Sequence, residues 1–330
     1  MKVLIVGLGS IGCRHLRNLR RIRPDVRVTA CRLSGRDDGF EQALQPDSVV
    51  YSLDDALSEG ADCGFVTGPA SVHVAVSLAL ARRDIHLFVE KPLSNTLQGV
   101  DQLIEECRRR GLVLAVGYNL RFFKPLQAMW QALRDGRIGR PTAFRAEVGQ
   151  YLPDWRPDRD YRTSVSARQA LGGGAVLELS HELDYARWLL GEVDSVSAQV
   201  GKLSDLDLDV EDTAEILLQF KNGAIGSVHL DMVQRPPRRV CRIIGAKGTL
   251  CWDGQSNHVK LYDTATSSWI DLYAGAAADY DDSYLEELRA FLESVEKSTP
   301  ARVNGDDGRL ALEIALAVKQ SAEQQRAVAV

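Results

Sequence analysis

The feature that most constrains the fold is a glycine-rich turn that directly follows an apolar run near the start of the chain. Residues 3–6 read Val-Leu-Ile-Val, and residues 7–12 read Gly-Leu-Gly-Ser-Ile-Gly. In such a pattern the first glycine makes a tight turn, the second lets another group approach the backbone, and the third lets a helix pack closely on the strand. The spacing predicts a strand, a turn at Gly7 and a helix, the opening unit of a parallel sheet with crossover helices.

Short β-rich runs alternate with helical segments over residues 1–120. The predicted strands are 3–6, 26–30, 49–51, 64–67, 86–89 and 112–116, and the predicted helices are 11–22, 54–59, 72–83 and 97–110. This alternation indicates an α/β fold whose N-terminal part, residues 1–120, is a Rossmann domain with a doubly wound parallel sheet.

The pattern changes after Tyr118. Helices are predicted at 125–134, 175–190, 283–296 and 306–326, a strand at 142–148, an irregular stretch at 150–171, and several strands with turns over 193–272. Such a succession is typical of an α+β domain with an open, mostly antiparallel sheet. We therefore assign residues 121–330 to a second domain, for substrate binding and oligomerisation.

Composition excludes several classes of function. The 330 residues carry a formal net charge of −5, whereas a protein that binds nucleic acid usually shows a basic excess. No apolar stretch approaches the roughly 20 residues that span a bilayer, and the first residues lack the pattern of a signal peptide. The six cysteines are scattered, which argues against a metal cluster or a disulfide framework. We expect a cytoplasmic protein with no metal, no membrane partner and no nucleic-acid partner.

The glycine turn predicts a dinucleotide site, because the N-terminus of the following helix offers N–H groups and a positive dipole end to phosphates. The alternative is a glycine turn without a ligand. An NAD site usually has an acidic residue about 20 residues further on, but Asp25 comes too early and Asp37 too late. Arg32, Ser34 and Arg36 instead suit a 2′-phosphate, so NADP is preferred and NAD is the alternative.

Four motifs in order resemble those of the glucose–fructose oxidoreductase, inositol dehydrogenase and MocA (Gfo/Idh/MocA) family. They are "GLGSIG" with His15, "TGPASVH" at 67–73, "FVEKPLS" at 88–94 and "GGGAVLELSHELDYARWLLG" at 172–191. The resemblance covers nearly the whole chain. It implies a Rossmann domain, an open-faced sheet domain, an active site that both supply, and substrates such as sugars, sugar acids, inositols or nucleotide-sugars.

The glycine turn, the residues after the second strand and the family motifs together give the predicted cofactor-binding residues. They are Gly7, Gly9, Ser10, Ile11, Gly12, Arg32, Ser34, Arg36, Thr67, Pro69, His73, Glu90 and Lys91. Lys91 follows a parallel strand at its carboxyl end, where ligands of open α/β sheets bind. There a lysine can hydrogen-bond a substrate oxygen and stabilise alkoxide character while a hydride leaves the carbon.

His181, Asp184 and Tyr185 share one face of a predicted helix. We expect His181 to exchange the proton of the substrate hydroxyl, and Asp184 to orient His181 or to contact the substrate. The alternative is a histidine that serves only the core. In the common family pattern an Asp stands four residues before this His, whereas here Glu178 stands three residues before it, so the partner of His181 stays open.

The irregular stretch 150–171 alternates aromatic and arginine side chains, which suit stacking on a ring and gripping an acid group. The alternative is a loop closed by internal Arg–Asp pairs. The predicted substrate-binding residues are Lys91, Asn119, Arg121, Tyr151, Trp155, Arg156, Arg162, Glu178 and His181. The stretch resembles family members associated with bacterial cell-surface carbohydrate synthesis, which implies an acidic sugar or a nucleotide-sugar.

The leading hypothesis is an NAD(P)-dependent oxidoreductase that interconverts a secondary alcohol and a ketone on a sugar-type substrate. One alternative is an NAD-linked inositol or sugar dehydrogenase of catabolism, and another is a catalytically silent regulator that senses dinucleotide. An open sheet face would expose apolar surface, so we expect a homodimer or a homotetramer.

Overall fold

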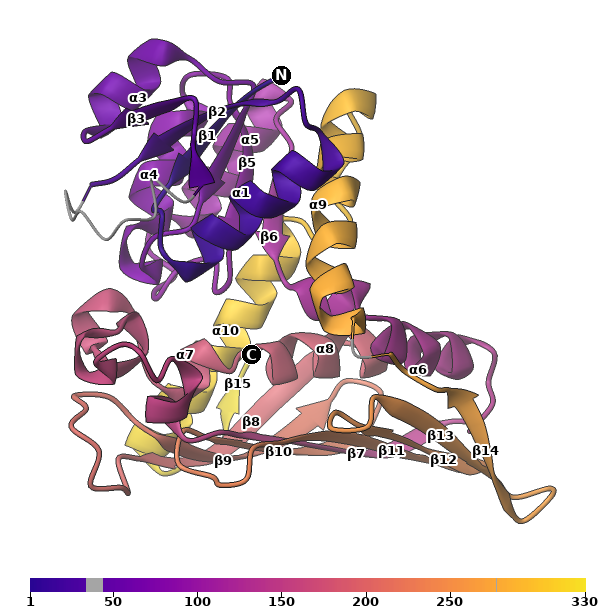
Figure 1. Cartoon of the computed structure of the whole chain (residues 1–330). Coiled ribbons are helices and arrows are strands. Elements are labelled where there is room, and N and C mark those ends of the chain that lie inside the picture. Colours follow the sequence, from indigo (N-terminus) through magenta and orange to yellow (C-terminus); the bar gives the residue numbers. More distant parts are fainter. Residues whose placement is uncertain (34–43, 277) are drawn as a thin grey trace. The chain divides into compact units, whose positions relative to one another are not determined.

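The computed structural model describes residues 1–33, 44–276 and 278–330 (Figure 1). The chain divides into two compact units, one of Met1–Asn119 with Tyr284–Leu310 and one of Leu120–Ser283 with Ala311–Val330. The predicted domains, 1–120 and 121–330, differ from these units chiefly at residues 284–310. That segment groups with the first unit because Leu288, Phe291 and Leu292 are buried in its hydrophobic core.

A six-stranded sheet forms the centre of the first unit, with the strand order β3-β2-β1-β4-β5-β6 and parallel pairing throughout. Its strands are β1 Lys2–Val6, β2 Arg27–Cys31, β3 Ser48–Val50, β4 Cys63–Val66, β5 His86–Glu90 and β6 Leu114–Gly117. Its helices include α1 Ser10–Ile22, α3 Leu53–Glu59, α4 His73–Ala81 and α5 Val100–Arg110, with a 3₁₀ turn η1 at Ala70–Val72. The strand order reverses at β1 and β4, which is the position where doubly wound sheets bind ligands. The predicted Rossmann fold is confirmed.

A nine-stranded sheet forms the second unit, in the order β14-β13-β12-β11-β7-β10-β9-β8-β15. The strands are β7 Pro141–Gly149, β8 Val193–Gly201, β9 Thr213–Phe220, β10 Ile225–Asp231, β11 Arg238–Gly245, β12 Gly248–Asp253, β13 His258–Asp263, β14 Ser268–Tyr273 and β15 Val328–Ala329. All pairings are antiparallel except the one between β7 and β10, which confirms the predicted mostly antiparallel sheet.

Helices cover one face of this sheet (Figure 1). The helices α6 Lys124–Arg134, α7 Ala175–Glu178 and α8 His181–Leu190 contact its strands. Residues alternate between buried and exposed along β9, so one set of side chains faces the helices and the other faces outward. Within the second unit, no helix of the described residues covers the outward face in Figure 1.

Two further helices are α9 Asp279–Lys297 and α10 Gly305–Gln324. The single helix predicted over 175–190 is wrong, because the chain forms α7 and α8 as separate helices. Leu179, with φ −100° and ψ 24°, lies outside the helical region and separates them. The irregular stretch 150–171 contains four short 3₁₀ turns, η3 Leu152–Trp155, η4 Tyr161–Thr163, η5 Val165–Ala167 and η6 Gln169–Leu171.

In the described part of the chain, no helix combines the length and apolar character needed to cross a membrane. The cysteines are free, and all except Cys251 are buried.

Candidate functional site

The three glycines of the first turn have different surroundings. At Gly7, where φ is +101°, an added Cβ would lie 2.7 Å from the amide nitrogen of Gly68. At Gly12 it would lie 2.1 Å from the Gly7 carbonyl oxygen. The fold itself therefore requires glycine at both positions.

Gly9 is different, because a Cβ there would meet no protein atom within 4 Å and its φ of −78° suits any residue. This residue is the N-cap of α1 and is exposed. The first turn of an α-helix has N–H groups without partners inside the helix, and these groups together with the helix dipole favour phosphate. An open glycine beside them leaves room for a pyrophosphate to approach the backbone. This arrangement fits a dinucleotide.

Arg32 lies at the end of β2, where dinucleotide sites contact the ribose. Its backbone N–H donates to the Val50 carbonyl at 2.9 Å, and the residue is only 4% exposed. Ser34 and Arg36, which the sequence assigns to the same site, lie outside the described residues.

Thr67 and Pro69 follow β4, and Thr67 contacts the glycine turn that follows the neighbouring strand. The hydroxyl of Thr67 donates to the Gly7 carbonyl, and its backbone N–H donates to the Val6 carbonyl at 2.9 Å. Pro69 is half-buried and caps the 3₁₀ turn η1. Thr67 thus braces the turn that the sequence predicts to bind the cofactor.

His73, the first residue of α4, is buried between two backbone carbonyls. Its Nδ1 lies 3.0 Å from the Pro92 oxygen, and its Nε2 lies 2.9 Å from the Gly68 oxygen. Burial lowers the pKa of His73, so the neutral ring donates to one of the two carbonyls at a time. In this position His73 links the loops that follow β4 and β5, and its predicted contact with the cofactor stays a prediction.

Lys91 is half-buried at the carboxyl end of β5, and the residue before it belongs to a buried pair. The Oε1 of Glu90 lies 2.6 Å from the Nε2 of His15, and its Oε2 accepts the Lys91 backbone N–H at 3.2 Å. The sequence pattern alone gives His15 no role. The available signal was its position three residues after Gly12, on the face of α1 that packs inward.

His181 is the first residue of α8 in the second unit and is 7% exposed. One buried and one partly buried ion pair hold the helix that carries it. Asp184 accepts from Nε and Nη2 of Arg121 at distances of 2.6 to 3.2 Å. Glu182 accepts from Arg239 on β11 at 2.7 and 2.9 Å.

Asp184 and Arg121 form a buried pair within the second unit. Asp184 is 0% exposed and both its oxygens accept from Arg121, which is 6% exposed. This pair holds α8, the helix that begins at His181. The roles expected of Asp184 beside His181 and of Arg121 at the substrate stay predictions.

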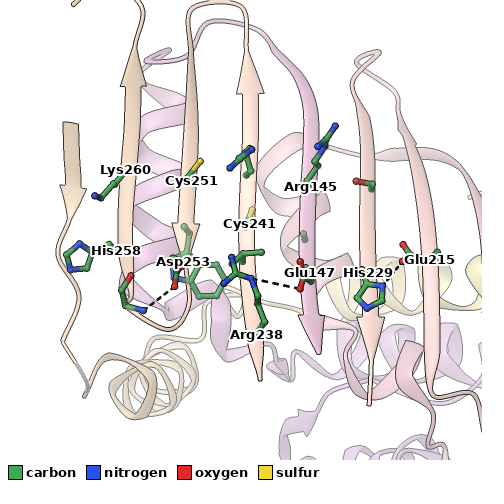
Figure 2. Close-up of a pocket in the computed structure, with 16 residues that line it drawn as sticks. Arg145, Glu147, Glu215, His229, Arg238, Cys241, Cys251, Asp253, His258 and Lys260 are labelled. Carbon is green, nitrogen blue, oxygen red and sulfur yellow. Dashed lines mark hydrogen bonds and ion pairs between the residues drawn. The ribbon is translucent and has the colours of Figure 1, made fainter. Parts of the chain in front are cut away.

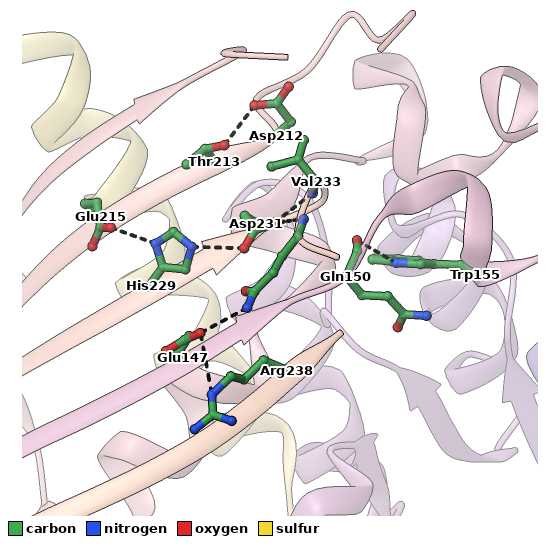
Figure 3. A network of polar contacts seen from close by, with 11 residues as sticks. Glu147, Gln150, Trp155, Asp212, Thr213, Glu215, His229, Asp231, Val233 and Arg238 are labelled. Carbon is green, nitrogen blue, oxygen red and sulfur yellow. Dashed lines mark hydrogen bonds and ion pairs between the residues drawn. The ribbon is translucent and has the colours of Figure 1, made fainter. Parts of the chain in front are cut away.

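The loop 150–171 is held both by its own contacts and by contacts with other parts of the second unit. Arg162 donates through Nε and Nη2 to Asp160, and the Nε1 of Trp155 donates to the Gln150 carbonyl at 3.0 Å, a contact drawn in Figure 3. The Arg235 guanidinium lies 3.7 Å from the ring centroid of Tyr151. For Arg162, the alternative of internal Arg–Asp pairing is the one observed.

The remaining predicted substrate residues lie in three different settings. Asn119 is buried at the end of the first unit, Arg156 is exposed on the loop, and Glu178 is half-buried at the end of α7.

The outward face of the nine-stranded sheet carries a broad hollow of about 770 Å³ lined by polar side chains (Figure 2). Figure 3 shows His229 between two carboxylates, with Nδ1 2.7 Å from Glu215 and Nε2 2.9 Å from Asp231. The hydrogen bond to Asp231, together with that to Glu215, raises the pKa of His229 to about 9 despite partial burial. The ring is therefore an imidazolium at neutral pH.

Comparisons with known proteins bear on both units. Residues 1–118 match a family model described as "Oxidoreductase family, NAD-binding Rossmann fold", and residues 126–251 match "GFO/IDH/MocA C-terminal domain". The chain is 31% identical to myo-inositol 2-dehydrogenase of Thermotoga maritima, over 99% of this chain and 98% of that protein.

Solved structures share the fold. A levoglucosan dehydrogenase in complex with NADH superposes with a TM-score of 0.89 at 19% identity, covering 100% of this chain and 99% of that one. A probable dehydrogenase from Thermotoga maritima gives a TM-score of 0.80 at 28% identity, covering 100% and 98%.

Proposed function

Because the chain belongs to the Gfo/Idh/MocA family of NAD-binding oxidoreductases, we propose that it interconverts a secondary alcohol and a ketone on a sugar-type substrate. The observation that carries this proposal is Gly9, an open glycine at the N-terminus of α1 for which the protein alone gives no reason. When bound, a nicotinamide cofactor supplies or accepts the hydride.

Lys91 and His181 divide the remaining chemistry. Lys91 hydrogen-bonds the reacting oxygen of the substrate and stabilises the negative charge that develops there. His181 takes the hydroxyl proton during oxidation and returns it during reduction. Asn119, Tyr151, Trp155, Arg156 and Glu178 are the proposed further contacts of the substrate.

Within this proposal, Arg32 sets the preference between NADP and NAD. An arginine stands where NAD-specific sites hold a carboxylate, and a guanidinium pairs well with a 2′-phosphate. We therefore favour NADP over NAD.

Two substrate classes are distinguishable. Exposed Arg156 in the loop 150–171 favours an acidic sugar or a nucleotide-sugar. Against this, Arg162 is already neutralised by Asp160, and the relative at 31% identity is a myo-inositol dehydrogenase. An uncharged polyol is therefore the second candidate.

Self-association through the outward face of the nine-stranded sheet completes the proposal. The face exposes Leu217, Ile225 and Trp269 beside the charged hollow, so a second copy of this surface would bury apolar area and pair opposite charges. A homodimer or a homotetramer results. The free thiols are in keeping with a cytoplasmic location.

The test begins with fluorescence titration of the protein with NADPH and NADH. It continues with a turnover screen of inositols, free sugars, uronic acids and nucleotide-linked uronic acids. Lys91→Ala and His181→Ala should each lose at least about a hundredfold in kcat, and His181→Ala should bind cofactor within about threefold of wild type. Binding without turnover on any substrate would favour the dinucleotide sensor, and absence of binding to either nucleotide would overturn the proposal.

A further inference from the structure

We infer that His15 is a positioning residue for Lys91 and acts through the carboxylate of Glu90. The inference rests on the proposed function, because it assumes that Lys91 contacts the reacting oxygen. It adds a residue on α1 to the machinery at the end of β5.

The contact is short and enclosed. The Nε2 of His15 lies 2.6 Å from Oε1 of Glu90, and the two residues are 0% and 7% exposed. Aromatic rings surround the imidazole, with the centroids of Phe88 at 5.0 Å and Phe65 at 5.6 Å. A buried hydrogen bond to a carboxylate is worth more than an exposed one, because water does not compete for either partner.

The direction of this hydrogen bond follows from the other ring nitrogen. Among the described residues, the buried Nδ1 of His15 has no hydrogen-bond partner. A proton on Nδ1 would therefore be buried without an acceptor, which costs free energy. The favoured tautomer carries its proton on Nε2 and donates it to Glu90.

The carboxylate of Glu90 is confined on its remaining sides. Its Oε2 accepts the backbone N–H of Lys91 at 3.2 Å. Gly117 is the register partner of Glu90 on β6, and a Cβ there would lie 3.0 Å from Oε2 and 3.1 Å from Cδ. The side chain of Glu90 therefore lies against Gly117. Any residue other than glycine at position 117 would crowd the carboxylate of Glu90.

These contacts connect the glycine turn to Lys91 within the first unit. α1 carries the glycine turn at its start and His15 on its second turn, His15 holds Glu90, and Glu90 holds the backbone of Lys91. Through these successive contacts, the hydrogen bond between His15 and Glu90 fixes the position of the Lys91 backbone relative to the glycine turn, which receives the pyrophosphate. A shift of about 1 Å in such a group can cost about a hundredfold in rate.

The experiment compares His15→Gln with His15→Asn. The side-chain nitrogen of Gln is the same number of bonds from Cα as Nε2, so Gln can donate to Glu90, whereas Asn is one bond too short. Both replacements are neutral amides, so they introduce similar polarity into the core. Leu19→Ala, one turn further along α1 and also buried, is the control for general loosening of the helix.

The first readout needs no substrate. Trace acetylation with acetic anhydride, quantified by mass spectrometry, reports the reactivity of Lys91 relative to the exposed Lys202 and Lys221. We expect this ratio to change by about tenfold in His15→Asn, and to stay within about threefold of wild type in His15→Gln and Leu19→Ala. Equal ratios in the Gln and Asn variants would overturn the inference.

The second readout separates binding from chemistry. With the substrate that gives the highest turnover in the screen, His15→Asn should lose about tenfold in kcat, while KM and the Kd for NADPH or NADH change less than about threefold. Wild-type protein that binds neither nucleotide would refute the proposed function. Normal nucleotide binding with a Lys91 ratio that His15→Asn leaves unchanged would refute only the role of His15.

Discussion

Replacing Gly9 with alanine tests the cofactor site with little disturbance of the protein. The added Cβ would meet no protein atom within 4 Å, and the φ of −78° is ordinary for alanine. Removing a glycine from the unfolded chain stabilises a protein by about 0.4–1 kcal/mol when the native backbone is compatible. The unbound Gly9→Ala protein should therefore be as stable as wild type or slightly more stable.

Binding should respond in the opposite direction. A pyrophosphate that approaches the backbone at Gly9 would meet the new methyl group and move away from the N–H groups of the first turn of α1. Each lost hydrogen bond to a charged group costs about 1.5–3 kcal/mol. Loss of one or two such bonds raises the Kd by about one to four orders of magnitude, since about 1.4 kcal/mol is tenfold.

The assay measures the Kd for NADPH and NADH by fluorescence, and the unfolding free energy by urea titration without nucleotide. Gly12→Ala is the matched comparison, because its Cβ would lie 2.1 Å from the Gly7 carbonyl oxygen and should reduce both stability and binding. Gly9→Ala with unchanged nucleotide affinity would refute the reasoning, because the open glycine would then have no ligand to explain it.

Three more outcomes follow from the described contacts. Arg32→Ala should weaken NADPH at least about tenfold more than NADH, and equal weakening in the same titrations would refute a 2′-phosphate site. Asp184→Ala leaves Arg121 buried without this carboxylate and should lower the unfolding free energy by about 3–5 kcal/mol in urea titrations; a loss below about 1 kcal/mol would contradict the buried pair. The pKa of His229 is raised to about 9, so its contribution to stability is complete below the unfolded pKa near 6.5 and disappears as pH rises through about 9. The stability advantage of wild type over His229→Gln should accordingly shrink between about pH 6.5 and 9.5, and a constant difference would be evidence against the raised pKa.

The local patterns of the sequence predicted most elements of both units. The run 3–6 and the glycines after it predicted β1, the turn and α1, because each depends on interactions among neighbouring residues. The break between α7 and α8 was missed. Residues 175–190 contain no proline or internal glycine, so no local signal marks Leu179 as the point where the helix ends.

The sequence also indicated which charged and polar residues belong to the candidate site, but it did not indicate their hydrogen-bond and ion-pair partners. The carboxylate of Asp184 was expected near His181 or the substrate, yet it pairs with Arg121, which lies 63 positions away in the chain. The residue His229 was overlooked. Its contact with Asp231 is local to β10, but Glu215 comes from β9 and meets His229 only when the two strands pair in register.

By itself, the sequence determined the parallel sheet, the glycine turn and the position of Lys91 at the carboxyl end of β5. These features follow from hydrophobic periodicity and from the backbone freedom of glycine, both of which act over a few residues. Only the tertiary structure decided which charged groups neutralise one another. His15 and Glu90 are 75 residues apart in the sequence. Both are buried where α1 packs against the sheet, so water does not compete for their hydrogen bond. In the proposed role of His15, this hydrogen bond fixes Glu90 and, through it, the backbone of Lys91.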